Sequence, residues 1–316
     1  MPAVRHSIHL RKCYVAASPI FLFMPTATLP PDHYAAPNRT ATGRAWRWLT
    51  ALAIFGNIFL NYYANTRPFA GQTMAVVSAK YPTLLTPAGY AFSIWGLIFL
   101  ALAVYAVWQL LPAQQKLSLP DALAKPLTLV SVATGAWVVL FAYELILPSV
   151  GVMLLILGGL IVTYGRARRR VFAEAAPALA GVPFSLYLGW ISVASVINFT
   201  IGLRQLGWQT AEGLSVTLTL GLLVVIVGLA LVISRVFRDM VFPLVVAWAL
   251  VWVWVARLRE VPELGWAALI GAAVAALGGI VLSRLGSRKT PWQLRDEAAA
   301  AAEAEIVARN ASRVRE

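Results

Sequence analysis

The chain has 316 residues, of which 60% are hydrophobic and 12% are charged, and its mean hydropathy is +0.74. Soluble domains carry about 25% charged residues, so this composition excludes a water-soluble fold. The formal net charge of +13 does not indicate a nucleic-acid partner, because the basic residues lie in short segments between long apolar runs. The sequence therefore predicts an all-α, polytopic bundle in a lipid bilayer.

Residues 1–45 precede the first long apolar run. We expect this tail to be disordered, or to result from a start site placed too early, with Met24 as the true start. The basic stretch Arg5–Lys12 and the short apolar stretch Cys13–Met24 also resemble a signal peptide. Cleavage would leave the new N-terminus outside, whereas the arginines just before the first span favour an N-terminus inside.

Eight apolar segments are candidates to cross a bilayer, which takes about 20 residues per span. They cover about residues 46–64, 91–111, 126–146, 149–165, 183–203, 213–234, 240–256 and 265–283. We divide the chain into a five-span bundle, three additional spans and a C-terminal segment, at residues 46–205, 206–283 and 284–316. The last segment is rich in Ala, Glu and Arg, which predicts a helix from about Pro291 to Arg313.

The lysines and arginines between the spans predict the orientation. If the N-terminus is inside, 15 of them lie on the inner side: Arg39, Arg44, Arg47, Lys116, Lys125, Arg166, Arg168, Arg169, Arg170, Arg235, Arg238, Arg284, Arg288, Lys289 and Arg295. Five lie on the outer side: Arg67, Lys80, Arg204, Arg257 and Arg259. This bias predicts a multi-pass protein of the cell (inner) membrane with both termini in the cytoplasm.

The connection between the first two spans, residues 65–90, is much longer than most others. It contains Pro68, Gly71, Pro82 and Pro87. Long loops in compact proteins are often functional. We predict that this loop folds over the outer mouth of the bundle as a lid.

Polar residues within the spans are candidates for a site, because polar groups in lipid usually face the bundle interior. Asn57, Asn61 and Asn65 form one stripe of the first span, which either binds a ligand or holds neighbouring helices. Glu144, which we place near the outer end of the third span, is a ligand anchor or a carboxylate that reaches water. Asn198 lies in the fifth span, with Arg204 at its outer end.

Two segments carry a resemblance to a known family. The first is Pro87-Ala-Gly-Tyr-Ala-Phe-Ser-Ile-Trp95, which opens the second span after a long loop. The second is Trp190-Ile-Ser-Val-Ala194-Ser-Val-Ile-Asn198, whose spacing puts Trp190, Ala194 and Asn198 on one helix face. Together they resemble the tryptophan-rich sensory protein family, also called the translocator family, over residues 46–205.

The resemblance implies a cavity between five helices, capped by the first loop, that binds porphyrins or other flat hydrophobic molecules. It also implies a homodimer. The implied pocket wall consists of Phe92, Trp95, Trp137, Trp190, Ala194 and Asn198, to which we add Asn61 and Glu144 from their predicted positions.

This sequence departs from the family pattern in three respects. Thr86 stands where the family has a second proline beside Pro87, and three spans follow the usual five. The stretch from Phe92 to Trp95 is one residue shorter than usual, which we expect to rotate Trp95 relative to the pocket.

Three classes of function compete. The first is binding, sensing or carrying of a tetrapyrrole or similar molecule, without a cofactor or metal. The second is a secondary transporter for a small amphipathic solute, for which Glu144 would be the coupling carboxylate. A weak similarity between Phe92-Ser-Ile-Trp-Gly and Phe184-Ser-Leu-Tyr-Leu-Gly-Trp190 allows a duplicated transporter. The third, an enzyme, lacks support because His6, His9, His33 and Cys13 all precede the first span.

Overall fold

The computed structural model describes residues 41–173, 178–208, 212–285, 297 and 299–304. The predicted tail lies outside these residues up to residue 40, but residues 41–45, assigned to that tail, are helical and begin the first long helix. Most of the predicted C-terminal helix also lies outside them; Glu297 and residues 299–304 are helical. The described part of the chain contains helices and no strand. This confirms the prediction of an all-α protein.

Each of the eight predicted spans overlaps one long helix of the described chain. These are α1 (Ala41–Thr66), α3 (Ile94–Trp108), α4 (Leu119–Ala142), α5 (Ile146–Ala173), α6 (Val182–Gln205), α7 (Glu212–Phe237), α8 (Val241–Arg257) and α9 (Pro262–Leu285). Six of them are long and apolar enough to cross a membrane, α3 together with the short helix η4 (Gly89–Ser93). The other two are α8, with 17 residues, and α1, whose asparagines and arginines lower its hydropathy. The chain is thus a polytopic helical membrane bundle.

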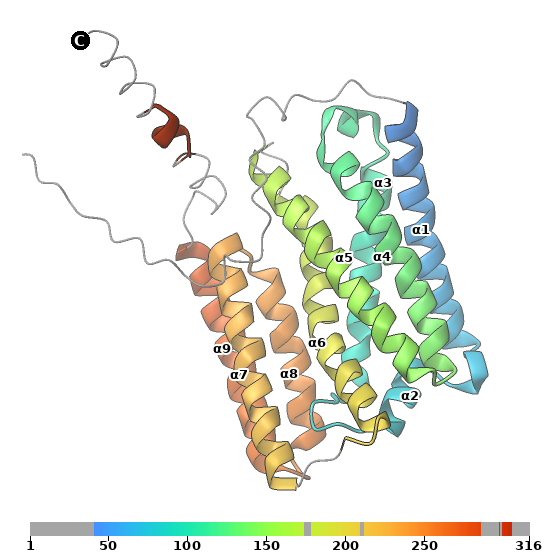
Figure 1. The fold of residues 1–316 in the computed structure, drawn as a ribbon, viewed down its shortest axis with the longest axis vertical. Coiled ribbons are helices and arrows are strands. Elements are labelled where there is room, and N and C mark those ends of the chain that lie inside the picture. Colours follow the sequence, from blue (N-terminus) through green and yellow to red (C-terminus); the bar gives the residue numbers. More distant parts are fainter. Residues whose placement is uncertain (1–40, 174–177, 209–211, 286–296, 298, 305–316) are drawn as a thin grey trace, which may run out of the picture. The chain divides into compact units, whose positions relative to one another are not determined.

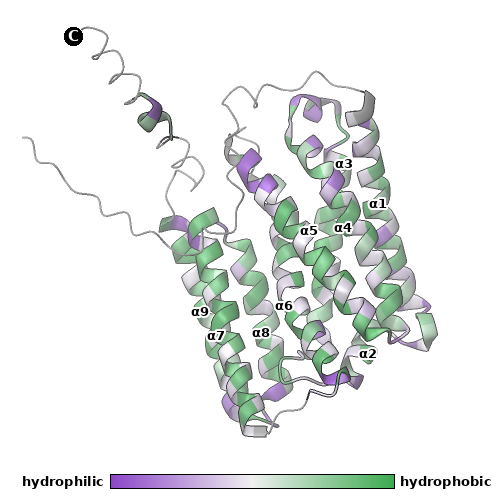
Figure 2. Cartoon of the chain, in the orientation of Figure 1, coloured by the Kyte–Doolittle hydropathy of each residue, from purple (hydrophilic) through white to green (hydrophobic). Residues whose placement is uncertain are grey.

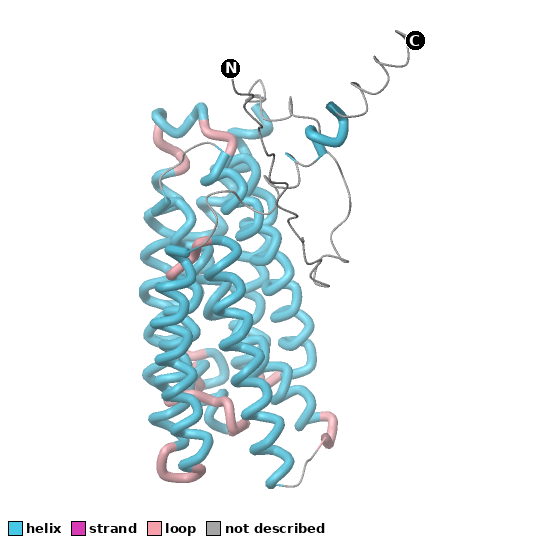
Figure 3. Tube along the Cα trace, turned by 90° about the vertical axis from the view of Figure 1, so that its left-hand side faces the viewer, coloured by secondary structure: helices cyan, strands magenta, loops and turns pink. Residues whose placement is uncertain are grey.

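Five helices form a closed ring, in which the neighbours in order are α1, α4, α5, α6 and α3. The other three, α7, α8 and α9, all contact one another and form a second group. Helix α8 joins the two groups because it packs against α6 (Figure 1). The long helices run side by side, and their connections gather at two ends (Figure 3).

Hydrophobic residues cover the long helices, whereas hydrophilic residues concentrate at the two ends (Figure 2). One end carries the connection between α1 and α3, which contains η3 (Phe69–Gly71), α2 (Met74–Lys80) and η4. We call residues 67–93 the lid, and this end of the bundle the lid end. The opposite end carries η5 (Pro112–Lys116) and η6 (Ala178–Gly181), together with the basic turn of α5.

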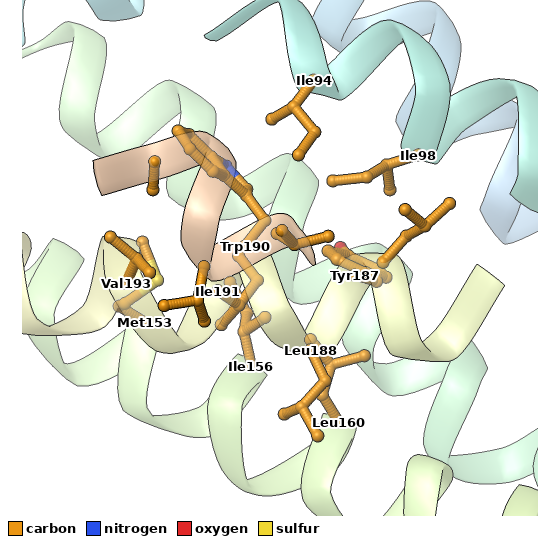
Figure 4. Close-up of a cluster of buried hydrophobic side chains, with 14 of the residues drawn as sticks. Ile94, Ile98, Met153, Ile156, Leu160, Tyr187, Leu188, Trp190, Ile191 and Val193 are labelled. Atoms are coloured by element: carbon orange, nitrogen blue, oxygen red, sulfur yellow. The ribbon is translucent and has the colours of Figure 1, made fainter. Parts of the chain in front are cut away.

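The interior is closely packed on both sides of α6. Tyr187 and Trp190 lie toward Ile94 and Ile98 of α3, whereas Leu188 lies toward Ile156 and Leu160 of α5 (Figure 4). Helix α8 approaches α6 at Gly189, where an added Cβ would lie 3.0 Å from Cβ of Val245. Small residues at such crossings let two helix backbones come close, which is a common mode of packing in membranes.

Three long helices end on similar turns, in which the first or second residue beyond the helix adopts a left-handed conformation. After α6 this residue is Gly207, with φ 83°. After α4 it is Glu144 (φ 58°), and after α7 it is Arg238 (φ 52°). A side chain in this conformation costs about 1–2 kcal/mol relative to the ordinary helical region, so two of the three turns are strained.

The turn after α4 corrects one prediction. Helix α4 ends at Ala142, so Glu144 does not lie within the third span. The helix also begins at Leu119, seven residues earlier than predicted, with Pro120 in its first turn. Prolines fit the first turn of a helix, and hydropathy alone does not register a polar first turn.

Candidate ligand pocket and its lid

A small cavity lies at the lid end of the five-helix ring. Its walls come from the lid, from α4 and from α6: Ser78, Pro87, Phe92, Trp137, Phe141, Trp190, Ala194, Ile197, Asn198 and Ile201. Five of the residues predicted from the sequence are among them, namely Phe92, Trp137, Trp190, Ala194 and Asn198. The structure therefore brings together side chains that are more than 100 residues apart in the chain.

Aromatic rings dominate this wall. The rings of Trp137 and Phe141 stack, with centroids 4.8 Å apart and planes at 15°. Those of Phe92 and Trp190 meet edge to face at 5.8 Å. Such pairs contribute about 0.5–1.5 kcal/mol beyond the area they bury, and they present flat apolar surfaces to the cavity.

Two polar atoms of the wall have no partner within the described residues. They are the indole nitrogen of Trp137 and the amide oxygen Oδ1 of Asn198, both buried. The amide orientation of Asn198 follows from its neighbour: Ser149 Oγ donates to the carbonyl of Ile146 at 2.7 Å, so it accepts from Asn198 Nδ2 at 3.3 Å. The wall thus holds one unused donor and one unused acceptor, each costly to bury alone.

The cavity has a volume of about 30 Å³. A buried water needs about 10–15 Å³ by the same measure, so the space suits one or two waters. Sites for small molecules usually measure about 300–1,000 Å³. A flat ligand therefore enters only if the lid or the aromatic rings move.

The three other predicted site residues lie outside the cavity wall. Trp95 packs edge to face on Trp190, with ring centroids 6.4 Å apart, and stacks on Phe99. Asn61 donates to Oδ1 and to the carbonyl of Asn57 within its own helix. The asparagine stripe of α1 therefore bonds along the helix, as Asn65 also donates to the Asn61 carbonyl at 2.9 Å.

Glu144, the third of these, fastens the lid. Its Oε1 accepts from Gln72 Nε2 at 2.9 Å and from Lys80 Nζ at 2.8 Å. Its Oε2 accepts from the hydroxyl of Tyr81 at 2.7 Å. All three donors belong to the lid, and the strained turn after α4 presents the carboxylate to them.

These hydrogen bonds shift the pKa values of Glu144 and Tyr81. The hydrogen bonds from Lys80, Gln72 and Tyr81 lower the pKa of Glu144 from 4.5 to about 2. The bond to the carboxylate also raises the pKa of the Tyr81 phenol above its ordinary value. Glu144 is therefore ionised at neutral pH, and Tyr81 is protonated.

The lid is also held from two other helices. At the end of α6, Arg204 Nη1 donates to the carbonyl of Pro82. From α8, Arg257 Nη2 donates to the carbonyl of Thr83 at 3.1 Å, and the Trp252 carbonyl accepts from the amide of Ala88 at 3.0 Å. The predicted lid thus contacts both the ring and the second group of helices.

A second polar cluster lies at the opposite end, between α5, α6 and the α7–α8 turn. Asp239 Oδ2 accepts from the Ser185 hydroxyl at 2.6 Å and from the Tyr164 hydroxyl at 2.8 Å, and it pairs with the Arg168 guanidinium. Its Oδ1 accepts from the amide of Val241 at 2.8 Å and so caps α8. Burial opposes ionisation of Asp239, but Arg168 and the hydroxyl donors outweigh it and lower its pKa.

A wider apolar groove of about 420 Å³ lies between α3, α6 and α8. Its wall includes Leu97, Leu186, Leu244 and Trp248. Leu97 and Leu244 are exposed at its rim, so the groove faces the lipid when the bundle is in a membrane.

Sequence reasoning missed most of these lid and ion-pair partners. Gln72 and Tyr81 stand in a loop with no motif, and Arg168 was counted among loop residues although it lies within α5. The hydropathy pattern could have identified Asp239 as a candidate site residue, because it is an acidic residue between two apolar runs. Among the described residues, no group of three His, Cys, Asp or Glu side chains could hold a metal ion.

The fold and the site define a class: a helical membrane bundle with an aromatic pocket under a lid. The sequence model of the TSPO-like protein family matches residues 47–281. The chain belongs to this family, and the matched region includes α7, α8 and α9 as well as the five-helix ring. Comparison with curated proteins and with solved structures gives no match.

Proposed function

We propose that this protein binds a tetrapyrrole or another flat hydrophobic molecule in the pocket under the lid, and that it senses or carries this molecule. The observation that carries the proposal is the wall of aromatic rings from the lid, α4 and α6, with one unused donor on Trp137 and one unused acceptor on Asn198. The proposal contains no catalytic step.

The small cavity gives this proposal a mechanism. Since the space suits only one or two waters, binding requires the pocket to open. The lid supplies Ser78 and Pro87 to the wall and is held by hydrogen bonds to side chains and carbonyls. Ligand exchange is therefore coupled to release of the lid, and the rate of exchange reports the rate of opening.

Quenching of tryptophan fluorescence by a porphyrin titrated into the purified protein tests the proposal. We expect saturable quenching with a dissociation constant in the micromolar range. Trp190→Leu removes a ring from the wall and should raise this constant about tenfold, equivalent to about 1.4 kcal/mol. Trp266→Leu is the matched control, because Trp266 is exposed on α9 and away from the cavity wall. Equal losses in both variants, or no saturable quenching, would refute the pocket.

One observation favours the second candidate, a secondary transporter for a small amphipathic solute. Arg168 and Asp239 form a buried ion pair, and paired ionisable groups within membrane segments often line routes for ions and protons. Gradient-driven solute uptake into proteoliposomes, together with no porphyrin quenching, would favour the transporter. The uptake should be lost in the double variant Arg168→Met with Asp239→Asn, which removes both charges and leaves no buried ion unpaired.

We also propose the orientation that the basic residues predict. The protein lies in the inner membrane, with the lid end on the outer side and both termini in the cytoplasm. The basic turn of α5 and the basic ends of α7 and α9 lie at the end opposite the lid. The homodimer stays a prediction, which light scattering of the detergent-purified protein would test.

A further inference from the structure

Helix α8 contacts the lid at four main-chain positions. Arg257 Nη2 lies 3.1 Å from the carbonyl oxygen of Thr83 and 3.4 Å from that of Thr86. The carbonyl of Trp252 accepts from the amide of Ala88 at 3.0 Å. The indole nitrogen of Trp248 donates to the carbonyl of Ala91 at 3.1 Å. Because each of these hydrogen bonds is to the lid backbone, they fix the path of the lid.

The contacted backbone includes the cavity wall. Pro87 lies between Thr86 and Ala88, and Phe92 follows Ala91; both line the cavity. The ring of Tyr90 also lies against that of Trp252, with centroids 5.5 Å apart. Helix α8 itself contributes no residue to the cavity wall. Its four main-chain contacts therefore act on the pocket by way of the lid, whereas its packing against α6 supports the opposite wall.

Helix α8 is well placed to hold a moving segment, because it is fixed at both ends. Asp239 caps its first turn and is bound to Arg168 of α5 and Ser185 of α6. At the lid end, Arg257 also pairs with Glu260. The side chain of Arg257 is 12% exposed, whereas that of Lys80, which bonds Glu144, is 46% exposed. Exposed ion pairs contribute little, and sheltered charged hydrogen bonds contribute more.

We propose that Arg257 and Trp248 are positioning residues for the pocket, and that helix α8 of the second group holds the lid closed and so limits ligand exchange. The limit on ligand exchange rests on the proposed function, whereas the closure of the lid by α8 does not. The closure can be measured without any ligand, so the failure of one proposal is distinguishable from the failure of the other.

The test measures how often the cavity wall becomes accessible. Ser78 is buried, lines the cavity and is similar in size to cysteine. In the full chain with Cys13→Ser and Ser78→Cys, a water-soluble maleimide should label position 78 slowly. Arg257→Gln should raise the labelling rate by at least about tenfold, equivalent to about 1.4 kcal/mol. Arg257→Lys should give an intermediate rate, because an ammonium group lacks the planar fork whose one arm bonds the lid carbonyls while the other bonds Glu260.

Arg259→Gln is the matched control. It removes the same charge two residues further on, from an exposed side chain, and should leave the labelling rate unchanged. If Arg257→Gln also lowers the melting temperature, Trp248→Phe is the second test, since it removes the indole donor to Ala91 and keeps a smaller aromatic ring. Parental labelling in both Arg257→Gln and Trp248→Phe, or equal acceleration by Arg257→Gln and Arg259→Gln, would overturn the proposal.

Discussion

The two ends of the bundle each hold a carboxylate that gathers donors from distant segments, but the two carboxylates differ in burial. Glu144 at the lid end bonds three lid residues, and its side chain is 30% exposed. Asp239 at the opposite end bonds Arg168, Ser185 and Tyr164, and its side chain is fully buried. Exposed charges exchange their partners for water at little cost, whereas buried charges do not. We infer that Glu144 is a releasable latch and Asp239 a permanent anchor.

The largest expected effect comes from the anchor. Asp239→Asn keeps an oxygen that can cap α8 and removes the charge, which leaves the Arg168 guanidinium buried without a counter-ion. Breaking a buried pair in this way costs about 3–5 kcal/mol. We expect a loss of about 3 kcal/mol in the free energy of unfolding, measured by denaturation of the detergent-solubilised protein.

The double variant Arg168→Met with Asp239→Asn is the control for this prediction. It removes both charges, so it should recover most of the lost stability, because an apolar replacement of a buried pair is often neutral. A single variant as stable as the parent would show that the pair is not buried in the folded protein.

The latch should respond to pH, but only in acid and in strong base. The pKa of Glu144 is about 2 in the folded protein and ordinarily 4.5, so its contribution is present above pH 4.5 and is lost as the pH falls toward 2. The raised pKa of Tyr81 acts at the other end of the pH scale. The hydrogen bond of the protonated phenol stabilises the closed lid below the ordinary pKa of tyrosine, and this contribution is lost as the pH rises through the pKa in the folded protein. The lid should thus stay closed from about pH 5 to 9.

Spin labels on the exposed residues Val76 of the lid and Leu206 after α6 would measure this closure, with both changed to cysteine and Cys13 changed to serine. We expect a narrow distance distribution across the neutral range and one that broadens as the pH falls toward about 2. Glu144→Gln should broaden it moderately at every pH, because the amide loses the charge that attracts Lys80. A distribution that broadens near pH 6 would contradict the assignment of the latch to Glu144.

The contrast between latch and anchor also shows what the sequence could predict. Long apolar runs located all eight long helices, and the spacing of Trp190, Ala194 and Asn198 put them on one helix face, which lies at the cavity. That this face belongs to a ligand pocket came from the family resemblance. The partners of Glu144 and Asp239 were not predictable in this way. Each added residue turns a helix by about 100°, so whether Arg168 faces Asp239 or solvent depends on a register that hydropathy does not encode. The asparagines of α1 illustrate the same limit, because their stripe was predicted but their bonding along the helix was not.

The smallest expected effect concerns the two strained turns that present these carboxylates. Arg238 precedes Asp239, is exposed and has φ 52°, a conformation in which glycine is not strained. Arg238→Gly should therefore stabilise the protein by about 0.5 kcal/mol, after the entropy cost of glycine in the unfolded chain is subtracted. Glu144→Gly relieves the same strain at φ 58° but removes the acceptor for Gln72, Lys80 and Tyr81. It should broaden the spin-label distances, whereas Arg238→Gly should leave them narrow. If both glycine variants kept a closed lid, the strain at Glu144 would serve only to end α4, and the carboxylate would not be a latch.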